Sequence, residues 1–143
     1  MCGIAGIIGR LDQKNRAALQ RMNDAMVHRG PDAAGVWAST PDDRGWGALL
    51  AHRRLAILDL SPAGVQPMLD PVTGHVIAFN GEIYNYLDLR RRLESEGQQF
   101  QSSGDTAVML RALGLHGPDA SSARSSEAKA IDQPESGSDD RAT

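Results

Sequence analysis

The chain has 143 residues, and its 15 Lys and Arg against 18 Asp and Glu give a net charge of −3. This length suits one domain and is too short for two ordinary ones. The slightly acidic balance argues against a general nucleic-acid or membrane-surface binder, because such proteins normally carry a basic patch.

The cysteine content and the lack of long apolar runs favour the cytoplasm as the compartment of this protein. Cys2 is the single cysteine, so the chain has no intrachain disulfide framework and suits a reducing environment. No basic segment followed by an apolar stretch is visible at the N-terminus, and no run approaches the roughly 20 apolar residues that span a bilayer. We therefore expect a soluble, cytoplasmic protein with neither nucleic acid nor membrane as a partner.

The N-terminal part of the chain predicts a strand, a helix and a second strand. Residues 3–8 are apolar and punctuated by glycine, which is typical of a buried strand. Asp12 is placed to cap a helix over residues 13–27, where apolar side chains recur at helical spacing. The helix must end before Pro31, because proline disfavours helical geometry just upstream of itself. Residues 36–38 form the second candidate strand.

The middle of the chain predicts further strands joined by turns. Residues 46–51 and 55–60 are two apolar stretches, with His52-Arg53-Arg54 between them. Residues 61–64 form a turn by composition. Residues 75–79 are another strand candidate, which ends abruptly at Asn80-Gly81, a pair that favours left-handed backbone geometry.

Two helices are predicted in the last ordered part. Asn85 is placed to cap a helix from about residue 86 to residue 96. Residues 100–101 are a short strand candidate. Asp105 is placed to cap a final helix, which Gly114 would end.

From Pro118 onward the composition changes. Ile131 is the single large apolar side chain of residues 118–143, which are otherwise rich in serine and charge. Such a segment cannot bury enough surface to offset its ordering entropy, so we expect a disordered tail.

Cys2 is the first candidate for chemistry. If Met1 is removed, Cys2 carries both a thiol and a free α-amine, and one residue then supplies a nucleophile and a base. A small apolar residue near a frayed chain end is the alternative reading, and position alone favours it. Other residues must therefore decide between the two.

Polar groups recur where predicted elements begin or end. Arg54 follows one apolar stretch, Asn80, Gly81 and Glu82 follow a strand, and Asp105 begins a helix. Taken singly, each also suits a structural role: a solvated strand end, a hairpin turn, a surface acid or a helix cap. The four histidines show no metal-ligand spacing, so no metal site is expected.

Five motifs in order resemble one known family. They are Cys2-Gly3-Ile4-Ala5-Gly6, His28-Arg29-Gly30-Pro31-Asp32, His52-Arg53-Arg54-Leu55, Asn80-Gly81-Glu82-Ile83-Tyr84-Asn85 and Ser103-Gly104-Asp105-Thr106. Together they look like the class II, N-terminal-nucleophile glutamine amidotransferase domain of glutamine-hydrolysing asparagine synthetases. The resemblance covers about residues 2–120. It implies an α+β fold, an αββα sandwich of antiparallel sheets.

The resemblance also implies a reaction. Cys2 would attack the side-chain amide of glutamine, while the Asn80 side chain and the Gly81 N–H stabilise the oxyanion. Ammonia would leave for transfer to aspartate, and water would hydrolyse the thioester. Arg54, with backbone groups near Leu55 and Ile57, would bind the substrate α-carboxylate. Glu82 and Asp105 would bind its α-ammonium, and the loop over residues 28–32 is implied to line the pocket.

The chain departs from the family after about residue 120. We expect residues 2–117 to form a partial glutamine amidotransferase type-2 domain, because members of the family continue with more strands that complete the sandwich. A separate synthetase domain then binds ATP and magnesium, so this chain needs no cofactor of its own. Its expected partners are glutamine and a separate synthetase chain or a second copy in a homodimer.

Three functions remain open from the sequence. The chain is an active glutaminase, an inactive truncated remnant, or a glutamine-binding module that needs a partner chain. The remnant reading has a physical basis, because missing strands leave open sheet edges and a half-covered apolar face. Retention of Cys2 speaks against the module that only binds.

Overall fold

The computed structural model describes residues 1–57 and 59–117. The expected disordered tail, residues 118–143, lies outside the described residues. The described part is an α+β fold with two antiparallel sheets, as the sequence predicts.

The larger sheet has three strands in the order β1-β3-β2. They are β1 (Gly3–Arg10), β3 (Trp46–Arg54) and β2 (Ala33–Ala38), and β3 pairs antiparallel with both neighbours. Gly3 pairs with Arg53, so the N-terminus of the chain lies at the end of β3. The two apolar stretches expected on either side of residue 52 are therefore not equivalent: the first runs on through Arg54 as one strand, while residues 55–57 have left the sheet.

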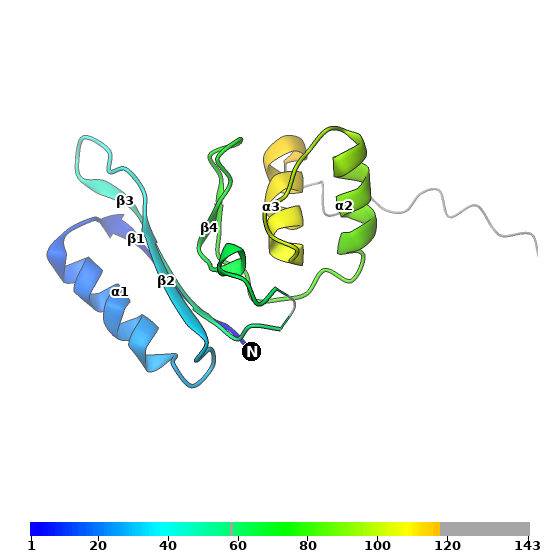
Figure 1. The fold of residues 1–143 in the computed structure, drawn as a ribbon. Helices are drawn as coiled ribbons and strands as arrows, with labels where there is room; N and C mark the ends of the chain where they lie inside the picture. The colour runs from blue at the N-terminus through cyan, green and yellow to red at the C-terminus, as the bar shows by residue number, and fades with distance from the viewer. Residues whose placement is uncertain (58, 118–143) are drawn as a thin grey trace, which may run out of the picture.

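Helix α1 (Gln13–Ala25) covers one face of this sheet, which we call the helix face (Figure 1). Its first turn is capped as predicted, because the Asp12 carboxylate accepts a 2.8 Å hydrogen bond from the Asn15 N–H. The buried side chains of Leu19, Leu49 and Ala51 form the core between helix and sheet. Burying these residues is the main stabilising contribution of this half of the molecule.

The opposite face of the sheet, which we call the inner face, looks toward the second half of the chain (Figure 1). Because side chains alternate along a strand, His52 and Arg54 lie on the face opposite Leu49 and Ala51. After β3 the chain crosses this face, and the backbone at Gln66 packs against Gly35. The inner face is thus partly covered by the segment that follows β3.

The second half consists of a short hairpin and two helices. A 3₁₀ turn (Pro62–Gly64) leads into the hairpin of β4 (Met68–Leu69) and β5 (Val76–Ile77). Helices α2 (Tyr86–Ser95) and α3 (Asp105–His116) pack on each other through the remaining small core. Its buried members are Leu93, Val108 and Ala112.

Several element boundaries differ from the sequence-based prediction. The strand expected over residues 75–79 keeps only β5, and residues 100–101 form no strand. Asp105 is not the cap of α3: Gly104 occupies that position, and the Asp105 carboxylate instead accepts a hydrogen bond from the Ile83 N–H. Gly114 does not end α3, because the positive φ of 74° that stops the helix belongs to Gly117.

Asn85 holds the N-cap position of α2 but makes no side-chain capping bond. Within residues 1–57 and 59–117, no helix is long and apolar enough to cross a membrane, and no His, Cys, Asp and Glu side chains group in threes that could hold a metal ion.

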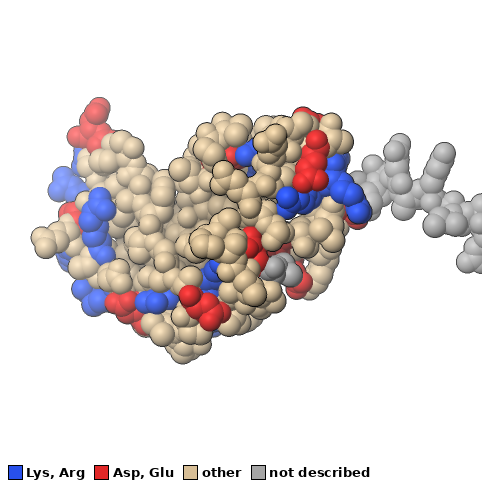
Figure 2. Space-filling view, viewed as in Figure 1, with Lys and Arg blue, Asp and Glu red and all other residues tan. Residues whose placement is uncertain are grey.

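Part of the inner face carries exposed apolar side chains. Ile8 is 87% exposed and Trp46 50% exposed, although both lie in strands. In the space-filling view, charged side chains gather toward the ends and the lower rim of the visible face, with an uncharged band between them (Figure 2). The helix face thus carries the buried core under α1, whereas the inner face is covered only in part.

Candidate functional site

A cavity of about 370 Å³ lies where the N-terminus and the end of β3 meet the segment after β5 and the start of α3. Four parts of the chain that are distant in sequence supply its walls. The walls include all eight residues singled out from the sequence: Cys2, Arg54, Leu55, Ile57, Asn80, Gly81, Glu82 and Asp105.

Cys2 lies at one wall, with its thiol against the backbone just past β3. Its Sγ is 3.4 Å from the Leu55 N and 3.8 Å from the Leu55 O. The N–H can donate to a thiolate, and the carbonyl can accept from a thiol, so this backbone position suits both states of the sulfur. The carbonyl of Cys2 accepts a 3.1 Å hydrogen bond from Arg29 Nε, which fixes the backbone that carries the thiol.

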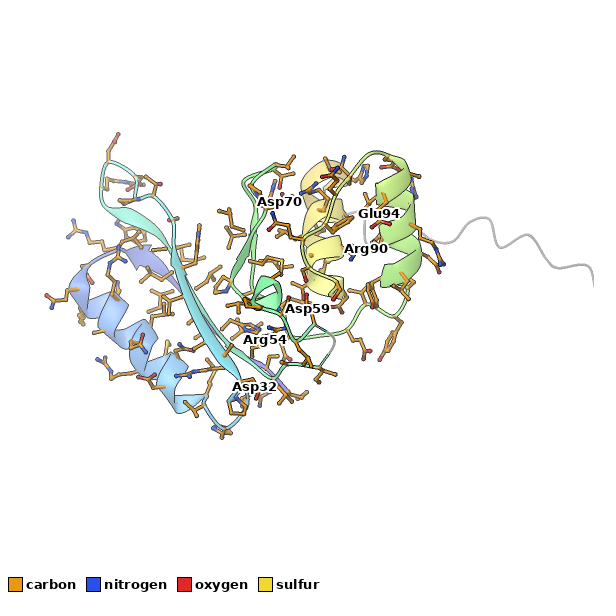
Figure 3. The ribbon with its side chains drawn as sticks, viewed as in Figure 1. Asp32, Arg54, Asp59, Asp70, Arg90 and Glu94 are labelled. Carbon is orange, nitrogen blue, oxygen red and sulfur yellow. The ribbon has the colours of Figure 1, made fainter. Side chains whose placement is uncertain are left out.

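Arg54 is the last residue of β3 and is only 9% exposed (Figure 3). One guanidinium nitrogen donates a 2.9 Å hydrogen bond to the Ser61 carbonyl. The other end of the guanidinium lies directly against Gly64, where any Cβ would overlap it. The 3₁₀ turn therefore forms a backbone cradle that aims a fixed, planar cation at the cavity.

Two carboxylates line the same cavity from other elements. Asp105, 6% exposed, begins α3, and one of its oxygens accepts a 2.9 Å hydrogen bond from the Ile83 N–H. Glu82 is exposed at the mouth. A buried guanidinium and these two acids, with Asp59 as a third acid, line one cavity, so it offers partners for both charges of a free α-amino acid.

The pair Asn80-Gly81 also lines the cavity, and both residues are exposed. A Cβ at Gly81 would lie 2.6 Å from the Phe79 ring, so a larger residue there would require the ring to move.

The chain matches a model of a family described as the glutamine amidotransferase domain, over residues 1–126. The chain belongs to this family. Its curated relatives include asparagine synthetase [glutamine-hydrolyzing] 3 of Bacillus subtilis, 38% identical over 114 residues, and asparagine synthetase B [glutamine-hydrolyzing] of Escherichia coli, 38% identical over 122 residues. The alignments cover 77% and 83% of this chain.

A putative asparagine synthetase [glutamine-hydrolyzing] 2 of Methanocaldococcus jannaschii is also 38% identical, over 78% of this chain. The same three alignments cover 17%, 20% and 23% of the relatives' own lengths. The chain therefore spans about a fifth of these proteins and corresponds to a glutamine amidotransferase domain within them.

In this amidotransferase domain the loop over residues 28–32 does not line the cavity, contrary to the expectation from resemblance. The loop instead forms hydrogen bonds with the backbone of the residues that line the cavity or flank them. Besides the bond from Arg29 to Cys2, the Asp32 carboxylate accepts a 2.8 Å hydrogen bond from the Ala56 N–H, and the Asp32 N–H donates to the Arg54 carbonyl at 3.0 Å. The motif thus positions the backbone on both sides of Leu55.

Sequence reasoning also missed Asp59, which joins two walls of the amidotransferase cavity (Figure 3). Its carboxylate accepts hydrogen bonds from the Ser102 hydroxyl at 2.6 Å, the Ser103 N–H at 3.0 Å and the Ser61 N–H at 2.8 Å. These bonds, that of the Ser102 hydroxyl above all, hold the pKa of Asp59 well below its ordinary value. An acid inside the apolar stretch over residues 55–60 was the available signal.

Proposed function

We propose that this amidotransferase domain hydrolyses glutamine to glutamate and ammonia with Cys2 as the nucleophile. The observation that carries the proposal is the convergence of a cysteine thiol, a buried guanidinium, two carboxylates and the Asn80-Gly81 turn on one cavity. Each group has a structural reading by itself, but a structural reading does not explain why they share a cavity.

The proposed reaction needs the α-amine of Cys2, which becomes free when Met1 is removed. The amine accepts the thiol proton, and Sγ bonds to the side-chain amide carbon of glutamine. The oxyanion of the tetrahedral intermediate accepts hydrogen bonds from the Asn80 side chain and the Gly81 N–H. The amine then gives its proton to the leaving nitrogen, ammonia departs, and water cleaves the thioester to glutamate and the free thiol.

Substrate recognition would use the charged walls. Arg54 suits the α-carboxylate because its planar fork can donate to both oxygens. Glu82 and Asp105 would accept from the α-ammonium, and the backbone near Leu55 and Ile57 would complete the carboxylate end. A site with both charges satisfied discriminates free glutamine from glutamine within a peptide, which lacks the two charges.

The relatives' names support a role for the ammonia. Each is called a glutamine-hydrolysing asparagine synthetase, so we propose that the ammonia is destined for aspartate. ATP and magnesium would then act in a synthetase part beyond the described residues or on a partner chain. We also propose that the two described sheets are the start of an αββα sandwich, which the partly uncovered inner face supports.

Glutamate release from glutamine by the purified chain tests the glutaminase function. Intact mass must first show that Met1 is absent. We expect turnover that Cys2→Ala abolishes, with an unchanged melt because Cys2 is only partly buried. Cys2→Ser is the matched control, since it keeps the size of the side chain and replaces the thiol by a poorer nucleophile. A processed, folded chain without turnover would contradict the proposal.

A module that binds glutamine and needs a partner is the second candidate function. The exposed Ile8 and Trp46 favour it, because the site is then built on a sheet with one incompletely covered face. Calorimetric titration with glutamine separates the candidates: binding without turnover by the Met1-processed chain supports the module, and binding with turnover supports the glutaminase.

A further inference from the structure

The backbone of Phe79 is held on both sides by buried side chains that the proposed reaction does not use. Its N–H donates a 2.6 Å hydrogen bond to Gln66 Oε1, and its carbonyl lies 3.1 Å from His52 Nε2. His52 is fully buried and Gln66 is 7% exposed. Phe79 immediately precedes the proposed oxyanion residues, so these contacts bear on where that turn lies.

The contact with Phe79 determines the protonation of His52. A carbonyl oxygen only accepts, so Nε2 must carry the proton in this contact. Nδ1 is buried and has no hydrogen-bond partner among the described residues. Burial, aided by the Arg54 charge, lowers the pKa of His52, although the Phe79 carbonyl opposes the shift. The ring is therefore a neutral Nε2–H donor, placed by β3 and aimed away from the helix face.

Gln66 bridges the same segment to the start of α3. While its Oε1 accepts from Phe79, its Nε2 donates a 3.3 Å hydrogen bond to the Thr106 hydroxyl, next to Asp105. The amide thus connects the residue before the oxyanion turn with a wall of the amino-acid site. Gln66 and His52 reach Phe79 from different elements, so the two bonds restrain different directions of motion.

The Phe79 side chain passes this restraint on to the turn. Its ring lies against Gly81, where an added Cβ would be 2.6 Å from the ring. Backbone and ring of one residue are therefore both engaged, the backbone by His52 and Gln66 and the ring by the backbone of Gly81. Oxyanion donors act only when they are placed for the transition state before it forms.

We propose that His52 and Gln66 are positioning residues for the oxyanion hole: they hold Phe79, and through it the Asn80 side chain and the Gly81 N–H. This inference rests on the proposed glutaminase function. The ground-state carbonyl of glutamine gains little from these donors, whereas the developing oxyanion depends on them. Loss of either contact should therefore lower kcat and leave KM nearly unchanged.

The kinetic arm of the test compares variants that remove or restore one contact. His52→Leu and Gln66→Met delete the contact with Phe79, and we expect kcat for glutamine hydrolysis to fall about 10–100-fold, within the range for a misplaced donor. His52→Gln offers an amide donor at a similar reach and should regain most of the rate. His75→Leu is the matched control, because His75 is exposed and directly precedes β5.

Amide hydrogen exchange supplies a readout that does not depend on activity. In the unmodified chain we expect protection at Phe79, which is lost in Gln66→Met and reduced in His52→Leu, while α1 keeps its protection as a measure of folding. Thr106→Val removes the other bond of Gln66 and should leave the protection of Phe79 in place. This control separates the anchor on Phe79 from the link to α3.

The two arms together distinguish the possible failures. Lost protection with lowered kcat and unchanged KM supports the proposal. Lost protection in a chain that never turns over glutamine contradicts the proposed function but leaves the anchoring of Phe79 established. Unchanged protection, or a rise in KM with kcat preserved, in folded His52→Leu and Gln66→Met would overturn the positioning role.

Discussion

The two faces of the three-stranded sheet are built from the same strands but differ in what they carry. On the helix face, Leu49 and Ala51 are buried against α1. On the inner face, Arg54 lines the cavity and the neighbouring His52 contacts the Phe79 carbonyl, while Ile8 at the other end is exposed. Alternation along β3 thus separates residues for stability from residues for the site within nine positions of chain.

The largest expected effect belongs to the helix face. Leu49→Ala leaves a cavity in the core between α1 and the sheet, and we expect the free energy of unfolding to fall by about 2–5 kcal/mol. Denaturant unfolding followed by circular dichroism measures it. The KM for glutamine of the molecules that remain folded should not change. A loss below about 1 kcal/mol would contradict the assignment of Leu49 to the main core.

Adjacent arginines offer the sharpest comparison of the two faces. Arg54→Gln removes the cation from the cavity, and we expect KM for glutamine to rise about 10–100-fold, as for loss of a hydrogen-bonded charge. Arg53→Gln is the matched control, because Arg53 donates on the helix face to the Asn23 carbonyl and to Asp24. It should lower stability slightly and leave KM unchanged. Equal KM effects in both variants would mean that the faces are not separate.

The free energy of unfolding should depend on pH through His52, which lies on the inner face. The pKa of His52 is lowered from 6.5 by burial, so as the pH falls through 6.5 the unfolded chain takes up a proton that the folded chain does not. Stability should therefore decline below pH 6.5, until the pH reaches the folded pKa. Thermal melts between pH 7.5 and 5 check this. His52→Gln should lose part of the decline, and His75→Gln, at an exposed position, should retain it.

The smallest change in the free energy of unfolding is expected for a substitution at Ile8, on the uncovered part of the inner face. Ile8→Thr keeps the β-branched shape, and because Ile8 is 87% exposed the free energy of unfolding should move by no more than about 0.5 kcal/mol. ANS fluorescence should fall as apolar surface is removed. Ile7→Thr is the control on the helix face and should destabilise, since Ile7 packs on the core of Leu19 and Leu49. Equal effects of the two would contradict the assignment of faces.

The sequence predicted the regular elements with strong local signals and missed what depends on tertiary contacts. Asp12 and the apolar spacing after it were sufficient to place α1. Asp105 looked equally like a cap, but its carboxylate bonds the Ile83 N–H, which lies 22 residues away in the chain and leaves no local pattern. Residues 100–101 have strand-like composition, yet Phe100 packs with the α2–α3 core instead of pairing.

For the site, the type and order of residues in the sequence predicted those that would contact a substrate. They did not predict those that hold the backbone of other residues in place. Cys2, Arg54 and Asp105 were found because they stand in motifs that resemble a known family, which implies their roles. His52 was noted only as part of a motif and as a histidine without metal-ligand spacing, and Gln66 was not considered, because a hydrogen bond to the backbone of Phe79 has no signature in a single sequence.

The pairing of Gly3 with Arg53 also determines which side chains can meet the thiol. A slip of β1 by one residue along β3 would bring a different neighbour to Cys2 and exchange the faces to which the β1 side chains point. Inserting or deleting a single residue in either strand should thus disable the domain while leaving each reactive side chain in the sequence. The register of β1 on β3 is therefore as necessary for the proposed reaction as the thiol of Cys2.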